Sequence, residues 1–321
     1  MNHSVPTWTL EDVQKHLQYA VDLELWTIPF YMAAMYSIED RSHPSFQLIQ
    51  TVVYQEMLHL QLAANVANAY GTELAIRPPA YIGDKIPHLN FRIDHPDPRL
   101  EFHPSSAEIG PLDLARVNSM CLIEYPKWAG HHRPELRPNI TEYGSIGEFY
   151  RAVQLGMTER AADLRGRRQQ VDEFGRFYAN MDRLTVDLDG EAGLAQALRL
   201  IQAITNQGEG EMRGERDIPT MFQNTADDAH AQHAHFGKFR RVREAVLGAH
   251  PPRTYSGVAH PPPGSPGARA QEILVRDFGA LCTLLQALFY GRDPAEFGPR
   301  MTKVGAAIFS CWQNGAIPRF S

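Results

Sequence analysis

"VVYQEMLHLQLAAN", residues 52–65, places Glu56 and His59 in the middle of an otherwise apolar helical pattern. Residues three apart on a helix lie on the same face, so the carboxylate and the imidazole would face the same neighbour. Leucine would pack better at both positions. Because the chain nevertheless keeps these two groups in the pattern, the sequence predicts that they bind something, and a metal ion is the first candidate.

A second helical pattern supplies a partner for this one. It runs from Thr9 to about Ile38, opens with the capping-box-like "TLED", and pairs with the pattern at 44–70 as an antiparallel hairpin. Each pattern has one stripe that is apolar except at its centre. The stripes read Leu17, Val21, Glu24, Ile28, Tyr31 and Met35 in the first helix, and Ile49, Val52, Glu56, His59, Ala63 and Val66 in the second.

Burying two neighbouring carboxylates is costly. An unpaired buried carboxylate costs several kcal/mol, and two of them repel each other. A divalent cation removes both penalties, and the spacing Glu-x-x-His lets both side chains reach one ion from one helix, as in di-metal carboxylate bundles. The alternative is a core ion pair that needs no metal. The additional Glu24 on the facing stripe makes the metal site the favoured interpretation.

Further ligands must come from other helices, and His235 is the best candidate. It shares an apolar stripe with Phe239, Val242 and Val246, whereas His230 and His233 fall off that stripe and are assigned to a solvated face. Gln232 stands three residues before His235, where a second complete motif would have Glu. The sequence therefore contains only one complete Glu-x-x-His motif among these helices, and a second carboxylate ligand near His235 is not identified by this spacing.

Glu209 in "AITNQGEGEM" is the candidate from a fourth helix. Its neighbours Gly208 and Gly210 weaken a helix, which indicates either room for a close ligand or a helix end. Glu148 and Glu124 compete with Glu209 for this role. For both competitors, a carboxylate at the surface or at a helix terminus is the favoured interpretation.

The remaining pattern is also helical, and no sustained alternation indicates strands. Residues 1–249 are predicted to form the metal-binding bundle with a loop-rich insertion at 72–144. The Pro/Gly-rich stretch 250–267 is predicted to be a linker, and residues 268–321 a C-terminal helical segment that packs on the bundle. Predicted helices beyond the first hairpin cover 111–124, a segment starting near Ser145, 191–207, 225–247, 271–291 and 296–311.

Composition excludes several classes of function. The chain has 321 residues, 43% hydrophobic residues and a net charge of −6, without a block of like charge. A short basic run, "RGRRQQ" at 165–170, is assigned to a solvated loop, so no nucleic-acid surface is expected. Three separated cysteines, no signal-peptide pattern and no apolar run of about 20 residues predict a soluble cytoplasmic protein without a membrane partner.

Several blocks together resemble a known family. "ELWTIPFYMAAMYSIED", "QEMLHLQLAANVANAYG", "IGEFY", "QGEG" and "AHFGKF" are similar to ferritin-like proteins identified as iminophenyl-pyruvate dimer synthases of violacein- and indolocarbazole-type biosynthesis, over roughly residues 10–245. The resemblance implies an all-α, ferritin-like four-helix bundle with a long crossover, to which this chain adds C-terminal helices. It also implies a metal site at Glu24, Glu56, His59, Glu209 and His235. This five-ligand pattern is similar to that of manganese catalases.

Carboxylates with two imidazoles suit iron or manganese, and Gln232 leaves open whether one or two ions are held. We therefore expect a metal-dependent oxidoreductase that uses oxygen or peroxide on a small, amino-acid-derived molecule, with oxidative imine coupling as the implied reaction. The alternatives are peroxide disproportionation and a non-catalytic ligand-binding bundle. Trp26, Phe30 and Tyr31 line a pocket or belong to the core, and Pro29 kinks its helix beside the metal or is merely tolerated. Bundles of this type often self-associate, so a homo-oligomer is expected.

Overall fold

The computed structural model describes residues 7–83, 85–86, 97–126, 136–208, 217–225, 229–292 and 297–321. Within these ranges the chain forms eight α-helices and no β-strand, so the predicted all-α class is confirmed. The helices are α1 (Leu10–Ser37), α2 (Pro44–Ala69), α3 (Leu114–Ile123), α4 (Ile146–Glu159), α5 (Gly190–Gly208), α6 (His235–Leu247), α7 (Pro266–Phe289) and α8 (Phe297–Gln313). Short 3₁₀ turns lie at Pro98–Leu100, Ile140–Glu142, Ala161–Asp163, Gly175–Phe177 and Thr220–Phe222.

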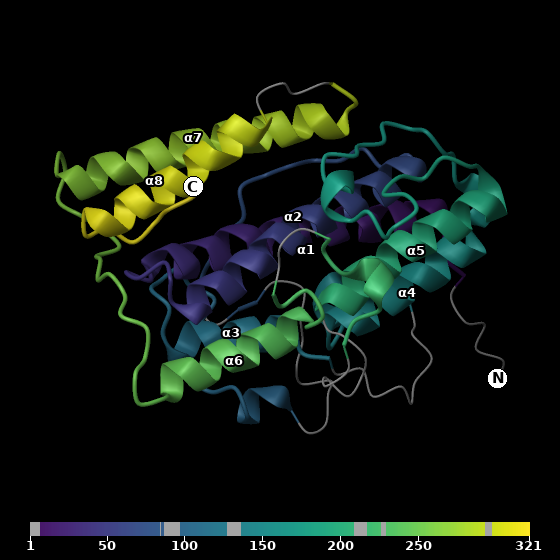
Figure 1. Cartoon of the computed structure of the whole chain (residues 1–321). Helices are drawn as coiled ribbons and strands as arrows, with labels where there is room; N and C mark the ends of the chain where they lie inside the picture. The colour runs from purple at the N-terminus through teal and green to yellow at the C-terminus, as the bar shows by residue number, and fades with distance from the viewer. Residues whose placement is uncertain are drawn as a thin grey trace.

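The helices are arranged in three layers (Figure 1). The central layer is the antiparallel hairpin of the long helices α1 and α2. On one side, α4 and α5 pack against one end of this hairpin, and α3 and α6 against the other end. On the opposite side lies the C-terminal pair α7 and α8. The half of the bundle that faces α1 and α2 is thus built from two short helix pairs.

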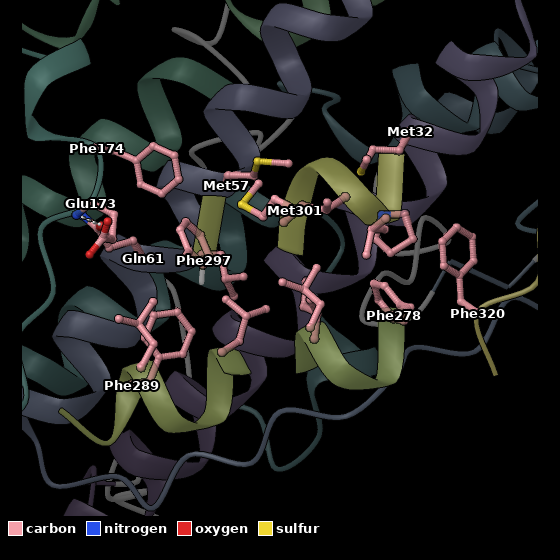
Figure 2. A pocket seen from close by; sticks show the side chains of 18 residues that line it. Met32, Met57, Gln61, Glu173, Phe174, Phe278, Phe289, Phe297, Met301 and Phe320 are labelled. Carbon is pink, nitrogen blue, oxygen red and sulfur yellow. Dashed lines mark hydrogen bonds between the residues drawn. The ribbon is translucent and has the colours of Figure 1, made fainter. Parts of the chain in front are cut away.

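Local sequence explains where most helices begin. Thr9 and Asp12 form the capping box predicted for α1, each side chain accepting the other residue's backbone N–H. Ser145 caps α4, and Ser265 with Pro266 starts α7. Pro29 lies inside α1, which continues through it. Its side chain faces the C-terminal layer, where it lines a pocket between the layers (Figure 2).

The predicted helix at 225–247 is wrong at its start. Residues 229–233 form a turn, in which the amide of His233 donates to the carbonyl of His230, and α6 begins only at His235. The carbonyl of Gln232 accepts the amide of Ile218 from a separate segment instead of an amide one turn later. This tertiary contact replaces the helical bond that periodicity alone predicts.

None of the helices in the described ranges has both the length and the apolar character needed to cross a membrane.

The start of α5 depends on close backbone packing at Gly193. A Cβ atom there would lie 1.9 Å from the carbonyl oxygen of Leu188, which belongs to rigid backbone. We expect Gly193→Ala to lower the free energy of unfolding by about 1–3 kcal/mol through overpacking.

The matched control is Gly279→Ala in α7, where a Cβ meets no atom within 4 Å. This change should raise the free energy of unfolding by about 0.5–1 kcal/mol. Urea midpoints measure both, and equal effects would contradict the packing argument.

Candidate metal centre

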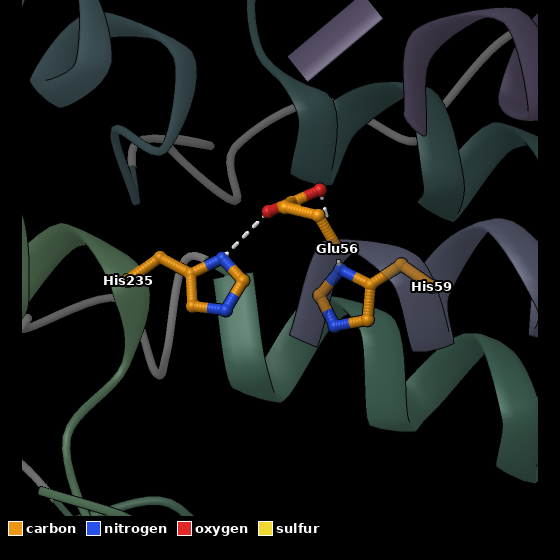
Figure 3. Close-up of side chains that lie close together, drawn as sticks. All are labelled: Glu56, His59 and His235. Atoms are coloured by element: carbon orange, nitrogen blue, oxygen red, sulfur yellow. Dashed lines mark ion pairs between the residues drawn. The ribbon is translucent and has the colours of Figure 1, made fainter. Parts of the chain in front are cut away.

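Glu56, His59 and His235 meet in the interior between the layers (Figure 3). One ligand atom from each of the three lies within 4.8 Å of the other two. Glu56 Oε1 lies 2.8 Å from His235 Nδ1, and Glu56 Oε2 lies 3.8 Å from His59 Nδ1. The two imidazole rings are nearly parallel, with centroids 5.2 Å apart. A single carboxylate therefore stands between two inward-facing ring nitrogens.

The first half of the centre is built on Glu24 and His59. Glu24 Oε2 lies 3.5 Å from His59 Nδ1, while its Oε1 accepts a hydrogen bond from the hydroxyl of Tyr150 on α4. The opposite ring nitrogen, His59 Nε2, lies 2.8 Å from Gln207 Oε1 at the end of α5. Gln207 Nε2 donates to the carbonyl of Phe222, which fixes its oxygen as the acceptor.

The second half repeats this arrangement with Glu124 and His235. Glu124 Oε2 lies 3.6 Å from His235 Nδ1, and its Oε1 accepts from the hydroxyl of Tyr31 at 2.7 Å. His235 Nε2 lies 3.1 Å from Gln55 Oε1. The buried ammonium of Lys238 donates to the same oxygen at 3.0 Å, which fixes that oxygen as the acceptor.

These contacts determine the tautomer of both imidazoles. Because each Nε2 faces a glutamine oxygen, each Nε2 must carry a proton and donate it. In the neutral ring, Nδ1 then presents a lone pair toward carboxylate oxygens. The Nδ1 of His235 makes no aligned hydrogen bond although it is fully buried. A lone pair that faces carboxylates in a dry interior is repelled unless a proton or a metal ion lies between them, so the donor set fits a metal ion.

Without a metal, protons on His59 and Glu24 reduce the repulsion between the buried carboxylates and the ring nitrogens. Burial disfavours the charged form of His59, but its contacts with Glu24 and Glu56 outweigh burial and raise its pKa to about 10. Burial raises the pKa of Glu24 to about 7, and burial together with the charge of Glu56 raises the pKa of Glu124. For Glu56, burial is outweighed by the two imidazoles, which hold its pKa well below the usual range.

Hydroxyl groups hold the three carboxylates in place. Thr27 on α1 donates to Glu56 Oε2 at 2.8 Å, and Tyr31 and Tyr150 donate to the outer two carboxylates. Burial, followed by the nearby carboxylate charges, raises the pKa of both tyrosines far above its ordinary value. Both tyrosines therefore remain protonated and act as donors.

Four of the five residues predicted as ligands meet at this centre: Glu24, Glu56, His59 and His235. The fifth, Glu209, lies outside the described residues. Glu148 is not part of the cluster, because it lies in the first turn of α4 and pairs with the amide of Gly144 and with Arg137. Gln232 precedes α6, and its side chain contacts His233.

The expectation for Glu124 was wrong in part. Glu124 does lie at a helix terminus, as the C-cap of α3, but it is only 3% exposed and faces His235. Its alignment with Val117 and Cys121 was the available signal. Gly208, the last residue of α5, makes room for it, since a Cβ there would lie 3.0 Å from Glu124 Oε2.

Sequence reasoning also missed the residues that orient the ligands. Gln55, Gln207 and Lys238 are fully buried polar side chains, and a polar residue on an apolar stripe was the signal that could have found them. Tyr31 binds Glu124 instead of serving as plain core or pocket wall. Trp26 and Phe30 stack on each other in the core; Phe30 also stacks on Tyr81, whose ring is tilted against that of Trp26.

A small pocket adjoins the cluster. Besides Glu24, Glu56, His59 and Glu124, it is lined by Thr27, Thr205 and Gly208 and by the apolar side chains Leu23, Ile146 and Ile204. The space between its walls is about 270 Å³, including its mouth. The carboxylates and His59 thus share the walls of this space with apolar side chains.

Comparisons with known proteins agree with this geometry. A family model described as "Ferritin-like" matches residues 17–244. The chain is 45% identical to a ferritin-like protein from Caulobacter vibrioides of known crystal structure, with a TM-score of 0.86 over 98% of this chain and 100% of that one. No protein with a curated description matches. The matched model spans well over half of the chain and includes the helices that carry the cluster, and the protein therefore belongs to the ferritin-like family.

Proposed function

We propose that the protein is a metal-dependent oxidoreductase whose centre would hold two ions, with Glu56 as a ligand that serves both halves. The observation that carries this proposal is the repeated arrangement of the two halves. In each half a carboxylate held by a tyrosine faces the Nδ1 of an imidazole whose Nε2 is bound by a glutamine. Glu56 presents one oxygen to each half. Glu24 and His59 would hold one ion, and Glu124 and His235 the other. The role of Glu209 as a further ligand stays a prediction.

The donor set favours iron or manganese. Three carboxylates and two imidazoles, without a cysteine ligand, suit these hard to intermediate ions more than copper or structural zinc. Bound there, iron or manganese would supply one-electron redox chemistry toward oxygen or peroxide. The chain's own contribution is to hold Glu24, Glu56 and Glu124 in place through the hydroxyls of Tyr150, Thr27 and Tyr31.

The substrate is proposed to be a small organic molecule. The pocket beside the cluster is lined by Leu23, Ile146 and Ile204 as well as by the carboxylates, so it offers a ligand both apolar and polar wall groups. An amino-acid-derived imine has this combination, and the resemblance to iminophenyl-pyruvate dimer synthases names oxidative imine coupling as the reaction in specialised metabolism. Peroxide disproportionation, which needs only a narrow channel, is the alternative. We expect the protein to work in the cytoplasm as a homo-oligomer, with neither nucleic acid nor membrane as partner.

The experiment is a reconstitution. Protein is stripped with a chelator, reloaded without oxygen with iron(II) or manganese(II), and tested for oxygen uptake with and without imines made from aromatic amino acids. Uptake that depends on both metal and imine supports the proposal. Rapid oxygen evolution from peroxide, without any effect of imines, would replace it with peroxide disproportionation. Failure to bind either metal would leave a non-catalytic bundle.

The glutamine at the end of α5 offers a second test. Gln207→Met removes the acceptor of the His59 Nε2–H at nearly constant volume, so the ring loses its fixed tautomer. We expect metal affinity to fall about 10- to 100-fold, the usual effect of losing such a partner. Gln202→Met changes an exposed residue of the same helix and should leave affinity unchanged. Isothermal titration with manganese(II) measures both, and equal affinities would contradict the assigned role of Gln207.

A further inference from the structure

A second pocket lies on the other side of the α1–α2 layer, beneath α7 and α8 (Figure 2). The space between its walls, including open solvent at its mouth, is about 600 Å³. Apolar side chains line it almost throughout, with phenylalanines and methionines prominent among them. The polar exceptions are Gln61 on α2 and Glu173 in the loop after α4.

This pocket is separate from the metal centre. On α1 the centre uses Glu24, Thr27 and Tyr31, whereas the pocket uses residues offset from them by about a third of a turn, such as Ile28 and Met32. On α2, similarly, the pocket is lined by Met57, Leu60 and Gln61, which do not face the site of Glu56 and His59. None of the three carboxylates of the centre lines this pocket.

Gln61, one of the residues that line this pocket, has an unused side-chain donor. Its Oε1 accepts the amide of Glu173 at 2.7 Å, and this bond fixes the orientation of the side-chain amide. Its Nε2 is therefore committed as a donor, but it is buried and has no hydrogen-bond partner. Gln61 as a whole is only 2% exposed to solvent. Buried amide donors in folded proteins almost always have an acceptor, so this group indicates a missing one.

The pocket is long and adaptable. In Figure 2, Gln61, Glu173 and Phe289 lie toward one end and Phe278 and Phe320 toward the other. Phe278 and Phe289 are both on α7, eleven residues apart, which corresponds to about 16 Å along the helix. Met32, Met57 and Met301 lie along the walls, and unbranched methionine side chains can move aside for a ligand.

The charge beside Gln61 restricts the head group of a ligand. The exposed carboxylate of Glu173 lies at the same end of the pocket and would repel an anion. Gln61 Nε2 requires an acceptor, so a protonated amine cannot satisfy it. A neutral oxygen, as in an alcohol, a ketone or an amide, meets both conditions.

We propose that this pocket binds a neutral amphiphile whose chain or ring system lies between α1–α2 and α7–α8 and whose oxygen accepts the N–H of Gln61. The site is independent of the metal centre. Its occupation therefore does not depend on the proposed oxidoreductase activity.

The test is displacement of the fluorescent probe N-phenyl-1-naphthylamine from the full-length protein. Decanol and decanamide should displace it at pH 8, and decanoate should do so at least about tenfold less well. Gln61→Met should weaken decanol binding about five- to tenfold, the size expected for one lost hydrogen bond, while binding of the hydrocarbon decane stays unchanged. Gln47→Met, on the exposed face of the same helix, is the matched control.

Two further measurements keep the proposal falsifiable. Met57→Trp should fill the pocket and abolish displaceable probe binding, and binding should be the same before and after removal of metal. Absence of probe binding to the unaltered protein would overturn the proposal. So would decanol binding that is equal in the Gln61→Met and unaltered proteins, or binding that disappears with the metal.

Discussion

Replacing Glu56 with glutamine is expected to lower the affinity for iron(II) or manganese(II) by more than about 100-fold, beyond the effect of losing an orienting partner. The change keeps the size of the side chain and an oxygen that can accept from Thr27, but it removes the charge that stands between His59 and His235. Because Glu56 serves both halves of the centre, neither ion should be retained. Any metal-dependent oxygen uptake should disappear with them.

Metal content after dialysis, measured by atomic emission, decides this prediction. The matched control is Glu148→Gln, which neutralises another buried glutamate whose partners are Arg137 and Gly144 outside the centre. Circular dichroism establishes that both variants are folded. If the Glu56 variant kept full metal content, Glu56 would not be a shared ligand, and the two-ion arrangement would have to be abandoned.

The first half of this centre could be predicted from the sequence because it is encoded locally. Glu24, Glu56 and His59 lie in the middle of two long, continuous helices, where helical spacing alone determines which side chains share a face. The hairpin connection is short, so the two stripes must meet. For these three residues, the helical spacing in the sequence is therefore enough to predict that their side chains meet.

The second half could not be predicted in the same way, because it lies where helices end. Glu124 is the C-cap of α3, and His235 is the first residue of α6. Their positions depend on how α6 packs against α2 and how α3 packs against α6, which sequence periodicity does not encode. A search for a second Glu-x-x-His motif therefore led to Gln232, although the carboxylate that faces His235 comes from α3. Its position at a helix end favoured a role outside the site in the sequence, but that position places Glu124 beside His235.

The affinity for divalent metal is expected to rise steeply with pH. In the metal-free protein the pKa of Glu24 is raised to about 7 and that of His59 to about 10. Both groups must lose a proton before they can bind an ion. Below pH 7, Glu24 and His59 together release two protons on binding, which raises affinity by about 100-fold per pH unit; between pH 7 and 10, His59 alone of these two releases one, giving about tenfold per unit. The raised pKa of Glu124 adds to this rise. Titrations in buffers with different ionisation enthalpies count these protons.

The same two groups determine how the stability of the metal-free protein depends on pH. A raised pKa in the folded state means that the protonated form favours folding. The contribution of Glu24 is fully present below its ordinary pKa of 4.5 and is lost as pH rises to about 7; that of His59 is present below 6.5 and lost as pH rises to about 10. Glu56, with its lowered pKa, contributes above 4.5 and loses its contribution only in acid. Chelated protein should therefore be most stable near pH 5 and lose stability steadily toward pH 10.

Bound metal should reverse this trend, because it replaces the protons on Glu24 and His59 with a cation that binds more tightly as pH rises. Thermal midpoints of chelated and metal-loaded protein should lie close together at pH 5 and separate progressively toward pH 9. Glu24→Gln provides the internal check, since it removes one titrating group and should reduce the number of protons released at pH 6 by about one. Midpoints of chelated and loaded protein that stay parallel across this range would show that no cation binds between Glu24 and His59.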